Sequence, residues 1–84
     1  MGELHAAEFF PDGRTLATAG GDGLVRFWDI YAGKMKNVLA GNTARIWSIA
    51  FSPDGKTLAT GSADGVVRLW NPYQEEHRLS LLSD

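Results

Sequence analysis

Few residues of this 84-residue chain have the types and spacing that catalysis or metal binding requires. His5 with Glu8, and His77 with Glu75 and Glu76, carry the side chains of acid–base pairs or metal ligands. The first pair lies near the start of the chain, and the second group falls in a segment expected to be a loop. We therefore expect both to be solvated surface, and we expect neither a metal site nor a cofactor.

The glycine-rich stretch Gly20-Gly21-Asp22-Gly23 is a candidate phosphate loop. Such a loop needs a helix after it, because the helix N-terminus supplies the N–H groups that hold the anion. Here the flanking segments have the pattern of strands, so the stretch is interpreted as a turn. Asp12-Gly13 and Asp54-Gly55 are also interpreted as turns, since the other oxygen ligands of a calcium loop are missing. Without a serine-centred nucleophile motif, the chain is predicted not to be an enzyme.

Composition narrows the class of partner. The net charge is -2 and the eight Lys and Arg residues are scattered, so the chain has no strong positive field for nucleic acid or an anionic membrane. The absence of cysteine excludes a disulfide framework and a thiol nucleophile. Neither a signal peptide nor an apolar run of roughly 18 residues is recognisable. We expect a cytoplasmic protein that binds neither nucleic acid nor membrane.

The chain repeats itself at a period of 42 residues. Phe9 to Thr18 aligns with Phe51 to Thr60, and 14 of the 23 positions from Phe9 to Tyr31 are identical to their equivalents 42 residues later. A fixed period of this length indicates one supersecondary unit used twice. Such a unit does not bury its own faces, so two copies imply further copies elsewhere.

Each unit is predicted to contain four short strands joined by turns. Helix is disfavoured because apolar residues do not recur at spacings of three and four, and ten Gly and three Pro interrupt every window. The runs are apolar on both faces, which is typical of sheets covered on both sides. The predicted strands are Leu4–Phe10, Thr15–Gly20, Leu24–Asp29, Lys36–Ala40, Ile46–Phe51, Thr57–Ser62, Val66–Trp70 and Arg78–Leu82.

The segment from Ile46 to Asn71 resembles the consensus of the WD-repeat β-propeller family, and the first copy ends its signature in Trp28-Asp29, the dipeptide that names the family. The resemblance covers essentially the whole chain. It implies an all-β fold of two four-stranded antiparallel propeller blades, residues 1–42 and 43–84. In the family a structural hydrogen-bond network joins a His, a turn Asp, a Ser or Thr and the Trp. The matching residues here are Thr18, Asp22 and Trp28 in the first copy, and Asn42, Thr60, Asp64 and Trp70 in the second, with Asn42 replacing the His.

Two blades do not close a propeller, which typically has 4 to 8. Because both ends of the chain present apolar segments, we predict closure by head-to-tail homo-oligomerisation. Four chains would make eight blades and three would make six, and four is preferred. An alternative is a fragmentary or engineered propeller with no activity beyond self-assembly.

Partner binding is the remaining expectation. Family members commonly bind proteins on the face where the first strand of each blade begins, which by position holds Glu3 and His5 in the first copy and Arg45 and Trp47 in the second. A partly exposed Trp beside an Arg is typical of interface hot spots. The alternative is that Trp47 only packs between blades. The chain is thus predicted to be a protein-interaction scaffold.

Overall fold

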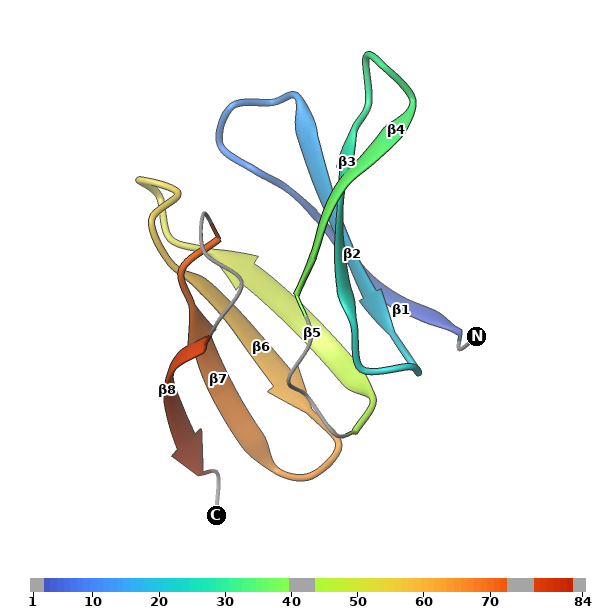
Figure 1. Cartoon of the computed structure of the whole chain (residues 1–84). Helices are drawn as coiled ribbons and strands as arrows, with labels where there is room; N and C mark the ends of the chain where they lie inside the picture. Colours follow the sequence, from blue (N-terminus) through green and yellow to red (C-terminus); the bar gives the residue numbers. More distant parts are fainter. Residues whose placement is uncertain (1–2, 40–43, 73–76, 83–84) are drawn as a thin grey trace.

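The computed structural model of the chain describes residues 3–39, 44–72 and 77–82. It contains two four-stranded antiparallel sheets, each with its strands in sequence order (Figure 1). This confirms the predicted all-β fold of two propeller-like blades. The first sheet is formed by β1 (Leu4–Phe9), β2 (Thr15–Gly20), β3 (Val25–Asp29) and β4 (Lys34–Leu39), and the second by β5 (Ile46–Phe51), β6 (Leu58–Ser62), β7 (Val66–Trp70) and β8 (His77–Leu82).

The strand β4 begins two residues earlier than the sequence pattern predicts. Gly33 has a φ of 66°, and its N–H donates to the Asp29 carbonyl at 2.9 Å. Because this contact closes the turn at once, pairing between the strands resumes directly with Asp29 opposite Lys34. At the other outer strand, β8 starts at His77, which the sequence placed in a loop.

The β1–β2 and β5–β6 turns share a hydrogen bond that the turn aspartate accepts from the N–H two residues ahead. They differ at the next residue, because Thr57 donates its N–H to Ser52 Oγ at 3.1 Å and not to the aspartate. The Asp12 carboxylate accepts hydrogen bonds from the N–H groups of Arg14 at 2.8 Å and Thr15 at 3.0 Å, and the bond from Arg14 is the main reason that the pKa of Asp12 is lowered. Asp54 accepts equivalently from the Lys56 N–H at 2.9 Å. An aspartate that bonds the backbone two residues ahead favours a turn over a continued strand.

The core lies between the two sheets. Strand β5 packs against β1 and β2, and residues from both sheets form one buried cluster between them. The side chains of this cluster come from both sheets, and alternate residues of β2 and β3, together with the last residue of β4, supply the first sheet's share. The buried apolar residues are Ala17, Ala19, Val25, Phe27 and Leu39 from the first sheet, and Ile46, Ile49, Leu58 and Trp70 from the second.

The repeated turns offer a matched pair of substitutions, because Gly13 and Gly55 have φ values of 68° and 73°. A Cβ at Gly13 would have no heavy atom within 4 Å, whereas a Cβ at Gly55 would lie 3.3 Å from Phe10 Cζ and 3.3 Å from Pro11 Cγ. We expect Gly13→Ala to lower the free energy of unfolding by about 1–2 kcal/mol, the usual cost of a left-handed L-residue. Gly55→Ala should lower it further.

Urea unfolding followed by circular dichroism measures both values. Equal losses for Gly13→Ala and Gly55→Ala would show that Phe10 and Pro11 do not constrain the second turn.

Candidate functional site

Each sheet contains a tryptophan hydrogen-bonded to a threonine on the neighbouring strand. Trp28 Nε1 donates to Thr18 Oγ1 at 2.9 Å, and Trp70 Nε1 donates to Thr60 Oγ1 at 3.0 Å. The pair in the second sheet is completely buried, while the pair in the first sheet is partly exposed. These contacts fix the orientation of each indole ring on one face of its sheet.

The turn aspartates of the anticipated network pair with arginines. Asp22 Oδ2 accepts from Arg26 Nη2 at 2.8 Å, and Asp64 Oδ2 accepts from Arg68 Nη2 at 3.0 Å. In both cases the arginine hydrogen bond is the main reason that the pKa of the carboxyl group is lowered. Asn42, which was matched to the histidine of the network, lies outside the described residues.

Equivalent positions in the two sheets differ in exposure. Leu4 is 66% exposed whereas Ile46, its equivalent 42 residues later, is 0% exposed, and the half-buried Trp28 corresponds to the 0% exposed Trp70. The difference arises because the first sheet covers this face of the second, while no described residue covers the same face of the first. We call this open surface the leading face; it is formed by Leu4, Phe9, Leu16, Thr18 and Trp28. Part of it, with Asp22 and Arg26 at its rim, lines a hollow of about 680 Å³.

The opposite outer surface belongs to the second sheet. The first-sheet residues Ala17, Ala19, Val25 and Phe27 are buried in the core, but their equivalents on β6 and β7 are only partly buried. We call this surface the trailing face; it is formed by Ala59, Gly61, Val67 and Leu69. The chain thus presents one uncovered apolar face at each end of the pair of sheets.

The four residues predicted to bind a partner lie on or just before β1 and β5, the first strand of each sheet, which we call the inner strands. The rings of His5 and Trp47 are in contact, with centroids 4.6 Å apart and planes tilted by 45°. Trp47 is nevertheless 50% exposed. Glu3 Oε1 lies 3.9 Å from His5 Nε2, and Arg45 is exposed. Trp47 therefore both packs across the two sheets and leaves half of its surface open.

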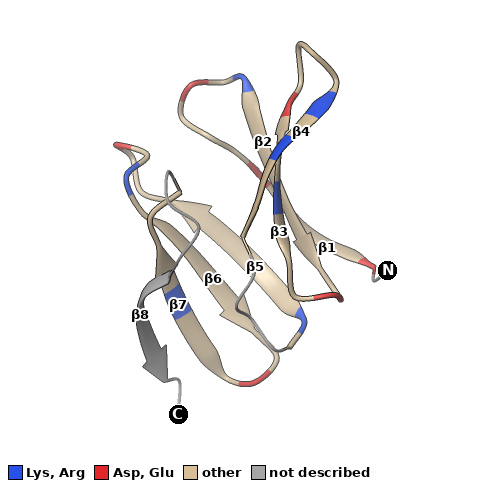
Figure 2. Cartoon of the chain, viewed as in Figure 1, with Lys and Arg blue, Asp and Glu red and all other residues tan. Residues whose placement is uncertain are grey.

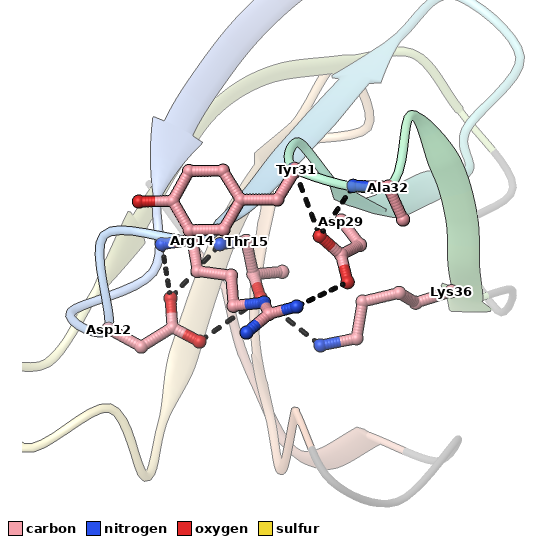
Figure 3. Close-up of polar contacts among 7 residues, drawn as sticks. All are labelled: Asp12, Arg14, Thr15, Asp29, Tyr31, Ala32 and Lys36. Carbon is pink, nitrogen blue, oxygen red and sulfur yellow. Dashed lines mark hydrogen bonds and ion pairs between the residues drawn. The ribbon is translucent and has the colours of Figure 1, made fainter.

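At the opposite end of the first sheet, charged groups surround the turn between β3 and β4. Arg14 Nη2 lies 3.3 Å from Asp29 Oδ2, and the Arg14 guanidinium carbon lies 5.3 Å from the centre of the Tyr31 ring (Figure 3). Lys36 Nζ donates to Thr15 Oγ1 at 3.2 Å. Because these groups satisfy one another, the cluster is interpreted as a support for the turn.

Other candidate chemistry gains little from the structure. Among the described residues, no group of three or more His, Asp or Glu side chains could hold a metal ion. Glu75 and Glu76 lie outside the described residues, and Glu8 is exposed. The charges of the described chain are spread over both sheets and their turns (Figure 2). No helix in the described part of the chain is long and apolar enough to cross a membrane.

The model of the WD domain, G-beta repeat, matches residues 2–29 and 33–71, which is most of the chain. The chain belongs to the WD-repeat family. A curated relative, the spindle assembly checkpoint protein bub3 of Schizosaccharomyces pombe, is 52% identical over 47 residues, which are 56% of this chain and 15% of the relative.

Solved structures share the fold. The structure of U3-55K superimposes with a TM-score of 0.92 and that of the RRP9 WD40 repeats with 0.91, each at 20% sequence identity. In both cases 99% of this chain is covered, but only 27% of the solved chain. The two sheets therefore have the arrangement of two neighbouring WD-repeat blades, and they span about a quarter of those solved chains.

Sequence reasoning did not identify the aspartates that pair with Arg26 and Arg68. The signal was present, since each aspartate precedes its arginine by four residues in both copies. In a turn followed by a strand, that spacing brings the two side chains together at the end of the sheet.

These ion pairs predict how stability depends on pH. The pKa values of Asp22 and Asp64 lie below the ordinary 3.8 in the folded chain, so their stabilising contribution is present above that pH and is lost as pH falls through the folded values. We expect the urea midpoint of Asp22→Asn/Asp64→Asn to fall less steeply than that of the unsubstituted chain between about pH 5 and pH 2.

The single variants serve as internal controls. The Arg68 side chain is 11% exposed and that of Arg26 is 35% exposed, so solvent screens the second-sheet pair less. Asp64→Asn should therefore flatten the pH profile more than Asp22→Asn. Profiles parallel to that of the unsubstituted chain would contradict a role for these pairs.

Proposed function

We propose that this chain is a non-enzymatic protein-interaction scaffold, formed by two blades, residues 1–42 and 43–84, of a closed β-propeller. Membership of the WD-repeat family supports the scaffold role, because WD-repeat propellers generally mediate protein–protein interactions and are typically not enzymes. The inner-strand surface around Trp47 supports it as well. A cytoplasmic location stays a prediction.

The pair of uncovered faces is the observation that supports closure into a ring. A leading face with Leu4 66% and Phe9 54% exposed is unfavourable in water, since burying a Leu or Phe side chain completely is worth about 1.5–3 kcal/mol. The trailing face lacks the polar surface with which terminal repeats of open arrays are capped. Both faces would be covered at once if further blades completed the ring.

We propose that copies of the same chain supply those blades, joined head to tail. Two blades per chain give an even total, and four chains would form eight blades while three would form six. Alternatively, the further blades would belong to a longer polypeptide that contains this chain. The matched relatives are several times longer than the span that this chain covers. The close likeness of the two repeats favours copies of this chain as the source. In a ring of identical chains, the leading face of one copy would meet a surface similar to the one that covers the equivalent face of the second sheet within the chain.

Native mass spectrometry distinguishes these arrangements. We expect a tetramer of the 9.1 kDa chain (4 × 9.1 = 36.4 kDa), with a trimer (3 × 9.1 = 27.3 kDa) as the second arrangement. The control is Tyr31→Glu, because Tyr31 is 74% exposed in a turn outside both faces and should leave the mass unchanged. A folded 9.1 kDa monomer at every concentration would contradict the ring.

The proposed partner surface consists of Glu3, His5, Arg45 and Trp47. Truncation of a half-exposed aromatic hot spot typically weakens binding by 2 kcal/mol or more, or roughly 30-fold. We expect Trp47→Ala to abolish recovery of a specific partner from cell extract while leaving the assembly mass unchanged. Loss of the assembly would assign Trp47 to packing between blades, and no specific partner for the unsubstituted chain would leave self-assembly as its activity.

A further inference from the structure

We propose that the leading face of one copy docks on the trailing face of a second copy, in the register that already joins the two sheets within one chain. This inference rests on the ring proposed above, and it identifies the surfaces and the direction of the contact. The two open faces are related to the buried interface by the 42-residue repeat, so the chain contains its own template for the contact.

The trailing face matches the surface that covers the second sheet. Positions 17 and 59 are both Ala, and positions 25 and 67 are both Val. Ala19 is replaced by Gly61 and Phe27 by Leu69, so both differing positions stay apolar and become smaller. The trailing face can therefore approach a neighbouring sheet as closely as the first sheet does within the chain.

The leading face of the first sheet matches the face of the second sheet that is buried within the chain. Leu16, Thr18 and Trp28 have the same residue types as their buried equivalents Leu58, Thr60 and Trp70. The tryptophan–threonine hydrogen bond is also the same, at 2.9 Å in the first sheet and 3.0 Å in the second. A surface already arranged for coverage in the second sheet is thus present, uncovered, in the first.

The aromatic contacts show which residues would meet. Within the chain, the Phe51 ring centre lies 6.2 Å from that of Phe27. Under the 42-residue repeat, Phe9 is equivalent to Phe51 and Leu69 is equivalent to Phe27. In the contact between two copies, Phe9 of one copy would therefore meet Leu69 of the next. Phe9, 54% exposed in the chain, would then be covered as Phe51 is.

The chemistry of the two faces sets the direction. The leading face presents a Trp28 indole beside the Asp22–Arg26 ion pair, whereas the trailing face presents small aliphatic residues. Two leading faces in contact would place two such ion pairs against each other with no small residues to accommodate the indoles. The contact is therefore heterologous, which allows rotation to close a ring.

A mixing experiment with two disabled variants tests this assignment. Leu4→Glu/Phe9→Glu places charge on the leading face alone, at side chains exposed in the chain and so tolerant of substitution. Val67→Glu/Leu69→Glu does the same to the trailing face. Each variant alone should be a 9.1 kDa monomer, and an equimolar mixture should give a heterodimer (2 × 9.1 = 18.2 kDa) and no larger species, because one intact face of each kind remains.

The outcomes separate this inference from the ring itself. If the unsubstituted chain forms a ring but the mixture stays monomeric, or if either variant alone still forms the ring, the assignment of the faces is wrong. If the unsubstituted chain is itself a monomer, the ring proposal fails first. Far-ultraviolet circular dichroism establishes that each variant is folded before the mixture is interpreted.

Cysteine cross-linking provides a second test that needs no charged substitution. The chain has no cysteine, so Phe9→Cys/Leu69→Cys introduces the only two thiols. These positions lie on opposite outer faces of one chain, and only a neighbouring copy would bring them together. A bis-maleimide cross-linker, which spans a longer gap than a disulfide, should give a ladder of covalent oligomers on a denaturing gel, whereas each single-cysteine variant should give no species larger than a covalent dimer. A double variant that yields no ladder although the ring forms would overturn the proposed register.

Discussion

A β-sheet that is apolar on both faces has to be covered twice, and among the described residues of this chain each sheet is covered once. The core between the sheets buries Leu58 and Trp70 completely, while Leu16 and Trp28, identical in type and at the same place in their own sheet, stay partly open. Since the equivalent residues differ in neighbours and not in chemistry, the missing neighbour is the cause. The open leading and trailing faces both follow from this difference in neighbours.

The polar contacts of the blades suit repeated stacking. Each indole N–H is satisfied within its own sheet by a threonine hydroxyl, so covering the indole face does not leave the indole N–H without an acceptor. The aspartate–arginine pairs likewise neutralise charge inside one sheet before a neighbour arrives. Stacking of further blades on the leading and trailing faces would therefore mainly remove apolar surface from water.

Sequence reasoning could predict the blades because the turns are local. Asp12 and Asp54 organise their turns with backbone groups two residues away, and the strands between turns are short and apolar. The early start of β4 was missed because the pattern shows Gly33 as a turn residue but not how tightly its N–H closes the turn on Asp29. The half-exposed, half-packed state of Trp47 could not be predicted either, since it depends on where the first sheet places His5.

The exchange of tryptophan indole protons tests the central claim most directly, because Trp28 and Trp70 make the same hydrogen bond to a threonine but differ in exposure. In the assembled protein the account predicts that the Trp28 indole N–H exchanges as slowly as that of Trp70, and that dilution below the assembly concentration accelerates exchange at Trp28 first. Trp28 exchange that stays much faster than Trp70 exchange at every concentration would show that the leading face is never covered, and would contradict the account.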